Sequence, residues 1–119
     1  MTDANLHNIE KIGSDRTLLL VDDDKPFLTR LARAMESRGF DVRTADSVEG
    51  GVIAVRSTAP AFAVIDLRLN DGNGLTIIEA IREKRPDARI IVLTGYGNIA
   101  TAVTAVKRGA VDYLAKPAD

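Results

Sequence analysis

Five side chains that could bind a cation or a phosphate oxygen stand directly after short apolar runs. They are Asp22 and Asp23, Asp66, Thr94 and Lys116, and they are spread over most of the chain. Short apolar runs that alternate with helical patterns predict a parallel sheet, in which the carboxyl ends of the strands meet at one edge. We therefore expect these five side chains to form one site.

Three carboxylates, one ammonium and one hydroxyl together favour phosphoryl transfer. Aspartates gathered in one place repel one another at neutral pH, and a bound Mg²⁺ relieves this repulsion because it prefers oxygen ligands. The Lys116 ammonium and the Thr94 hydroxyl can bind the oxygens of an incoming phosphoryl group. Phosphoryl transfer depends mainly on positioning and charge neutralisation, so a carboxylate such as Asp66 can be the nucleophile without a histidine base.

The apolar pattern predicts the strands that position these side chains. We expect strands at residues 18–21, 41–45, 61–66, 89–94 and 111–115. The runs at 18–21 and 90–93 are continuously apolar, which indicates strands that are buried on both faces in the middle of the sheet. Short loops and right-handed crossovers then place helices on both faces of a doubly wound α/β fold.

Helices are predicted between consecutive strands. The first has Pro26 at its first helical position, and the second is capped by Ser47 and weakened by the pair Gly50-Gly51. The third begins near Leu75 and closes before the proline at 86. In the fourth, the spacing of residues 99, 103 and 106 predicts that these positions line the inner face.

Composition limits the class of protein. A chain of 119 residues fits one domain, and a net charge of -1 gives no electrostatic footprint for nucleic acid. The absence of cysteine excludes disulfides and thiolate metal sites within these residues. No apolar stretch approaches the ~18–20 residues that span a bilayer, so we expect a soluble, cytoplasmic protein with no membrane partner. Residues 1–16 are interpreted as a polar N-terminal tail.

From Thr17 to Pro117 the chain resembles the receiver domain of two-component response regulators. That family places a pair of acids after strand one, an aspartate after strand three, Thr or Ser after strand four and Lys-Pro after strand five, and this sequence fills every position. The segments 66–75, 93–103 and 109–117 resemble, more narrowly, the redox-responsive global regulators of photosynthesis and respiration. The resemblance implies a flavodoxin-like (CheY-like) five-stranded parallel sheet of order 2-1-3-4-5.

The resemblance also implies roles for the acidic residues. Asp66 would accept a phosphoryl group from the phosphohistidine of a sensor histidine kinase. Mg²⁺ would be held by Asp23, Asp66 and the main-chain carbonyl of Arg68, with Asp22 contributing through water. The receiver would catalyse only its own phosphorylation and dephosphorylation, and would not be an enzyme with a separate substrate.

Further implied roles concern the switch that follows phosphorylation. Thr94 and Lys116 would bind the phosphoryl group, and Thr94 and Tyr113 would be the switch residues that reshape the face of helix four and strand five. The bond between Lys116 and Pro117 is a cis peptide in the family. The sequence departs from the family pattern at Asn70, where the family usually has a proline.

The expected domain spans residues 17–119 and stops before the family's fifth helix. Such regulators act on transcription through a C-terminal helix-turn-helix output domain, which this sequence does not contain, so any contact with DNA would need that domain. Without the fifth helix, apolar surface beside strand five is expected to be exposed. We therefore predict self-association, as a homodimer or as an oligomer that exchanges elements between chains.

A phosphatase of the haloacid dehalogenase type is the main alternative. The pattern Asp22-x-Asp24 after an apolar strand, with Thr94 and a late lysine, resembles its motifs and would make Asp22 the nucleophile. Such enzymes need further acids after the lysine, and this interpretation leaves Asp66 without a role.

Two other motifs fail on spacing. An EF-hand that uses Gly72 as its loop glycine would put Leu67 where the first carboxylate belongs. The run 95–100 matches a dinucleotide fingerprint but lies in the fourth βα unit, whereas that fingerprint belongs to the first.

Overall fold

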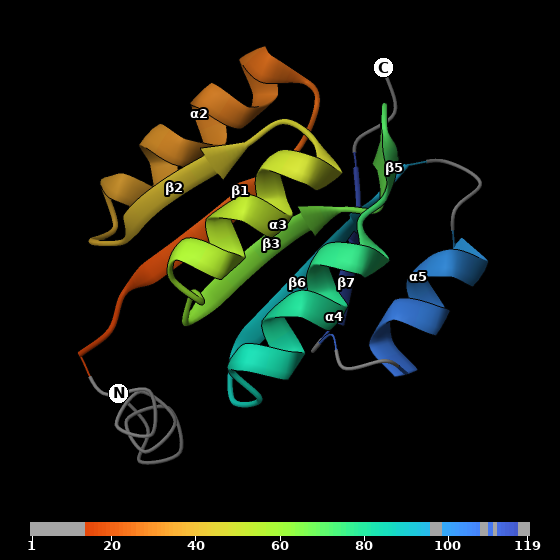
Figure 1. Ribbon diagram of the computed structural model, residues 1–119. Coiled ribbons are helices and arrows are strands. Elements are labelled where there is room, and N and C mark those ends of the chain that lie inside the picture. Colours follow the sequence, from red (N-terminus) through yellow and green to blue (C-terminus); the bar gives the residue numbers. More distant parts are fainter. Residues whose placement is uncertain (1–13, 96–98, 108–109, 111, 117–119) are drawn as a thin grey trace, which may run out of the picture.

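The computed structural model describes residues 14–95, 99–107, 110 and 112–116, and it contains a parallel sheet of five strands (Figure 1). The strands are β1 (Thr17–Val21), β2 (Asp41–Ala45), β3 (Phe62–Asp66), β6 (Arg89–Thr94) and β7 (Asp112–Ala115). Their order, β2-β1-β3-β6-β7, confirms the predicted order 2-1-3-4-5. Two short strands, β4 (Arg68–Leu69) and β5 (Gly72–Asn73), pair antiparallel as a small hairpin that the sequence pattern did not predict.

Helices cover both faces of the sheet. Helix α2 (Lys25–Glu36) packs on one face, and α3 (Val48–Ser57), α4 (Leu75–Lys84) and α5 (Ile99–Lys107) pack on the other (Figure 1). The larger core lies beneath the three helices, where alternate strand residues such as Ile65, Ile90 and Val92 are fully buried. The two continuous apolar runs form β1 and β6, which lie on either side of β3, so both are interior strands of the sheet, as predicted.

Side-chain caps fix where two helices begin. The Asp24 carboxylate accepts a hydrogen bond from the Phe27 amide at 3.1 Å, so α2 begins at Lys25 and Pro26 is its second residue rather than its first. Ser47 caps α3 as predicted, and its hydroxyl accepts from the Gly50 amide at 2.9 Å. Both caps lie at the carboxyl edge of the sheet, so they place the start of each helix beside the candidate site.

Gly51 has a packing role that accounts for one of the two adjacent glycines of α3. A Cβ at position 51 would lie 2.5 Å from Cδ1 of Ile77 in α4. Ile77 is fully buried, so the two helices approach closely only because position 51 has no side chain. The intrinsic weakness of this helix is the cost of that close contact.

Helix α5 is rotated relative to the prediction. Val103 was expected on the inner face, but its side chain is 40% exposed, whereas Ala105 is fully buried and Val106 packs partly against the core. The small side chain of Ala105 allows the helix backbone to lie close to the sheet, and this rotation carries Val103 outward. The side chain at position 99 lies outside the described part of the structure.

An ion pair ties the beginning of β1 to the end of α4. Asp15 lies 2.7 Å from Arg85, and it also accepts hydrogen bonds from the amide and the hydroxyl of Thr17 at 2.9 and 2.6 Å. The bonds from Thr17 first, and then Arg85, lower the pKa of Asp15 to about 2. Of the predicted tail, only residues 14–16 are described.

The described helices are short, and none of them is long and apolar enough to cross a membrane.

Candidate functional site

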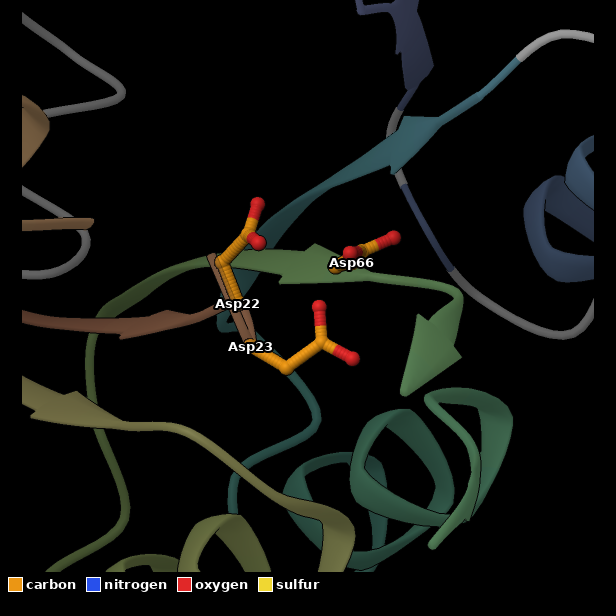
Figure 2. A group of neighbouring side chains, drawn as sticks. All are labelled: Asp22, Asp23 and Asp66. Carbon is orange, nitrogen blue, oxygen red and sulfur yellow. The ribbon is translucent and has the colours of Figure 1, made fainter. Parts of the chain in front are cut away.

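Three carboxylates meet at the carboxyl edge of the sheet. Asp22 and Asp23 directly follow β1, and Asp66 is the last residue of β3 (Figure 2). The two strands are paired with Val21 opposite Ile65, and this register brings Asp22 beside Asp66. One oxygen from each of the three carboxylates lies within 4.8 Å of the others. The structure therefore brings together the acidic residues that the sequence predicted.

Lys116 follows β7 and reaches the two buried members of this cluster. Its ammonium lies 2.7 Å from Oδ2 of Asp22 and 3.1 Å from Oδ2 of Asp66. The main-chain amide of Lys116 donates to the Thr94 carbonyl at 2.8 Å, which fixes the residue beside the end of β6. The ammonium also lies 5.3 Å from the centre of the Phe27 ring in α2, a cation–π contact that the sequence did not indicate.

Burial makes the negative charges of this site costly. Asp22 and Asp66 are 1% and 4% exposed, and burial raises the pKa of Asp66 against the opposing effects of the Arg68 amide and Lys116. Burial also acts to lower the pKa of Lys116, but Asp22 and Asp66 outweigh it and raise that pKa. One ammonium thus serves two buried carboxylates, with Asp23 half-buried beside them, and further positive charge would stabilise the cluster.

The donor set fits a hard divalent cation. All three side chains offer oxygen atoms, which Mg²⁺ and Ca²⁺ prefer. Among the described residues, the Lys116 ammonium at 2.7 Å is the partner of the buried Oδ2 of Asp22, which leaves this oxygen with capacity for a further positive ligand. An open cleft reaches the cluster and is lined by Asp23, Asp66, Arg68, Asn70, Gly95 and Lys116.

The two predicted switch residues lie on neighbouring strands. Thr94 is fully buried at the end of β6, and its hydroxyl donates to the Gly95 carbonyl at 3.2 Å rather than to the carboxylates. Tyr113 on β7 is half-buried against the core under α5 and lies opposite Val92 of β6. Pro117, and with it the predicted cis peptide, lies outside the described residues.

Gly74 belongs to this site, although the sequence alone indicates only that it ends a loop. A Cβ at this position would overlap the main-chain carbonyl oxygen of Asp66 and would lie 2.8 Å from Cγ2 of Ile65. Its amide donates to the Leu67 carbonyl at 2.9 Å. Glycine is therefore required here by close backbone approach, because its φ of -61° is available to any residue.

Comparison with known proteins identifies the family. The family model for the response regulator receiver domain matches residues 18–119. The chain belongs to this family. It is 69% identical over 109 residues to the photosynthetic apparatus regulatory protein RegA of Rhodobacter capsulatus, a match that covers 92% of this chain and 59% of RegA. It is also 62% identical over 121 residues to the acid tolerance regulatory protein ActR of Rhizobium meliloti, covering 100% of this chain and 62% of ActR. The chain thus spans about three fifths of the length of these curated relatives.

Solved structures agree with the fold. A response regulator from Burkholderia pseudomallei, crystallised with a phosphorylated aspartic acid, a calcium ion and citrate, matches with a TM-score of 0.80 and 45% identity over 88% of this chain and 62% of that chain. A CheY-like receiver domain from Methanospirillum hungatei matches with a TM-score of 0.80 and 28% identity over 87% of this chain and 83% of that chain. The predicted flavodoxin-like receiver fold is confirmed, and the alternative phosphatase with Asp22 as nucleophile is not favoured.

Proposed function

We propose that this receiver domain accepts a phosphoryl group on Asp66. The observation that carries the proposal is the convergence of three carboxylate oxygens within 4.8 Å, with the Lys116 ammonium 3.1 Å from Asp66 Oδ2 and an open cleft leading to it. The related structure from Burkholderia pseudomallei, with its phosphorylated aspartic acid and its calcium ion, supports the same chemistry.

In the proposed reaction, an oxygen of Asp66 attacks the phosphorus of a phosphohistidine in a sensor histidine kinase. A new O–P bond forms and the P–N bond of the donor breaks, with its electron pair left on the imidazole nitrogen, which takes up a proton. Asp22, Asp23, Asp66 and the Arg68 carbonyl would hold Mg²⁺, which supplies charge neutralisation for the phosphoryl oxygens. Lys116 would bind one phosphoryl oxygen, and its position between two carboxylates keeps it protonated.

The proposed output is a rearrangement of α5 and β7. The Thr94 hydroxyl, which now donates to Gly95, would turn to a phosphoryl oxygen, and Tyr113 would move into the space that Thr94 leaves. Both residues lie at or beside the core under α5, so the change would reshape the outer surface of that helix. We propose that this surface controls a DNA-binding output domain in the longer protein, in line with the relatives, which are named as regulatory proteins and are longer than this chain.

The proposal can be tested with phosphoramidate, a small donor whose P–N bond resembles that of phosphohistidine. The chain, Asp66→Asn and Asp22→Asn would be incubated with the donor in Mg²⁺ or in EDTA, and phosphorylated protein would be separated on a phosphate-affinity gel. We expect a retarded band for the wild-type chain in Mg²⁺ only, and none for Asp66→Asn. A band that persists in Asp66→Asn and disappears in Asp22→Asn would contradict the proposal and support the phosphatase.

A further inference from the structure

The hairpin that follows Asp66 is fastened to a helix that begins more than twenty residues earlier in the sequence. Asp71 lies in the turn between β4 and β5, and its carboxylate accepts hydrogen bonds from two amides at the start of α3. The distances are 2.8 Å from the Val48 amide and 3.1 Å from the Glu49 amide. These bonds connect the loop after the phosphoacceptor with the first turn of α3.

The carboxylate is well matched to this position. Amides at the start of a helix lack partners within the helix and carry partial positive charge, so they favour an anionic acceptor. The hydrogen bond from Val48, followed by that from Glu49, lowers the pKa of Asp71, which is therefore charged at neutral pH. Ser47 caps a different amide of the same helix, that of Gly50, so Ser47 and Asp71 bind different amides at the start of α3.

The other end of the hairpin is held against Asp66. Oδ1 of Asp66 accepts from the Arg68 amide at 3.1 Å, and Arg68 pairs with Asn73 across the hairpin. Gly74 closes the loop against the Asp66 carbonyl. The hairpin thus contacts the phosphoacceptor at one end and, through Asp71, α3 at its turn, while Asn73 accepts from the Leu75 amide at 2.9 Å and Leu69 is buried in the core.

The sequence of this loop supplies little stiffness of its own. Residues 67–74 contain no proline, and Gly72 has a φ of +153°, so local backbone preferences do not fix the hairpin. Its two strands have only two residues each, and short isolated hairpins are marginal in water. The order of the loop therefore comes from its contacts with the rest of the chain, among them the burial of Leu67 and Leu69 in the core and the hydrogen bonds of Asp71.

We propose that Asp71 is a positioning residue for the metal and phosphoryl site, which fixes the Arg68 carbonyl by fastening the hairpin to α3. The inference rests on the proposed function, because it assumes that this carbonyl faces the bound cation. Asp71 touches neither phosphoryl group nor metal and acts only through the loop. Loss of an outer contact that orients metal ligands typically weakens metal binding by about 10–100-fold.

The test compares two caps of the same helix. Asp71→Ala removes the link between the hairpin and α3, whereas Ser47→Ala removes a cap hydrogen bond of α3 without touching the hairpin. Mg²⁺ affinity would be measured by isothermal titration calorimetry, and the phosphorylation rate with acetyl phosphate. Thermal unfolding in EDTA would show that both variants fold.

We expect both variants to unfold at a lower temperature than the wild-type chain, but only Asp71→Ala to lose Mg²⁺ affinity, by roughly tenfold. Asp71→Asn retains one acceptor oxygen, so its Mg²⁺ affinity should lie between those of Asp71→Ala and the wild-type chain. Amide hydrogen exchange of residues 68–74 should be faster in Asp71→Ala and unchanged in Ser47→Ala.

Two results would overturn the inference, and they differ from failure of the proposed function. Equal Mg²⁺ affinity in Asp71→Ala and the wild-type chain would exclude a positioning role, as would an equal loss of affinity in Ser47→Ala. If the wild-type chain itself neither bound Mg²⁺ nor accepted a phosphoryl group, the proposed function would fail, and the role of Asp71 would fail with it.

Discussion

Replacing Lys116 with methionine tests the electrostatic account of the site. The variant keeps a long unbranched side chain but removes the ammonium that lies 2.7 Å from Asp22 and 3.1 Å from Asp66. Both carboxylates are almost fully buried, so the variant leaves them without a compensating charge. We expect Lys116→Met to be less stable than the wild-type chain in the absence of metal.

The size of this loss follows from the geometry. With an effective dielectric constant of about 20, the two contacts correspond to gross attractions of about 6 and about 5 kcal/mol. Desolvation cancels most of this, and removal of one partner from a buried pair costs about 3–5 kcal/mol. The Lys116 side chain is 24% exposed, which places the expected loss lower, at about 2–3 kcal/mol.

Magnesium and acid should each reduce this loss. Mg²⁺ replaces the missing positive charge, so the variant should gain at least about 1 kcal/mol more from saturating Mg²⁺ than the wild-type chain gains. Burial already raises the pKa of Asp66, and loss of the ammonium raises it further. An acid whose pKa is raised by folding destabilises the protein at higher pH, so the deficit should shrink as the pH falls.

The assay is urea denaturation followed by circular dichroism, in EDTA and in Mg²⁺, at neutral and mildly acidic pH. Lys25→Met is the control, because it removes the ammonium of an exposed ion pair. The Lys25 Nζ lies 3.6 Å from Oδ2 of Asp46, and the two side chains are 77% and 51% exposed. That variant should change stability by less than about 0.5 kcal/mol. Equal stability of Lys116→Met and the wild-type chain in EDTA, or equal gains from Mg²⁺, would refute the reasoning.

Substitutions that alter three other contacts give further predictions. Asp15→Asn should lower the unfolding free energy at neutral pH by about 1 kcal/mol, a modest loss because Asp15 is partly exposed. The difference in unfolding free energy between this variant and the wild-type chain should vanish as the pH falls from near 3.8 through about 2. Urea denaturation across this pH range would measure it. Gly51→Ala should destabilise the fold by about 1–2 kcal/mol, because the new methyl group would meet Ile77. In a double-mutant cycle, Gly51→Ala and Ile77→Val, which removes Cδ1, should be coupled by more than about 0.5 kcal/mol. Strictly additive effects of the two substitutions would contradict the contact. Gly74→Ala should destabilise the fold by about 2 kcal/mol, as measured by thermal unfolding, and should also slow phosphorylation by acetyl phosphate. An unchanged phosphorylation rate would show that the loop tolerates the extra methyl group.

The strands and the site were predictable because both depend on where apolar runs end. Residues 18–21 and 89–94 are nearly continuous apolar runs, and each is followed or closed by a side chain of the site. A parallel sheet aligns these ends whatever the loops do, so the meeting of Asp22 with Asp66 needed no knowledge of side-chain contacts. The order of the strands came from the family resemblance, since no local pattern specifies which strands pair.

The hairpin and its contacts were not predictable in the same way. Strands β4 and β5 have two residues each and no alternation of apolar and polar residues, so nothing distinguishes them from a loop. The bonds of Asp71 to the start of α3 depend on how two distant segments approach in space. The rotation of α5 was missed because a helix with apolar residues on several sides, such as Val103, Ala105 and Val106, has more than one plausible inner face.

The most direct test of the central claim is to locate the phosphoryl group. The chain would be incubated with acetyl phosphate and Mg²⁺, the acyl phosphate would be reduced with borohydride, and the altered residue would be found by peptide mass spectrometry. We expect reduction at Asp66, and only in the presence of Mg²⁺. Modification at Asp22 or Asp23 in its place, or no modification while the chain remains folded, would contradict it.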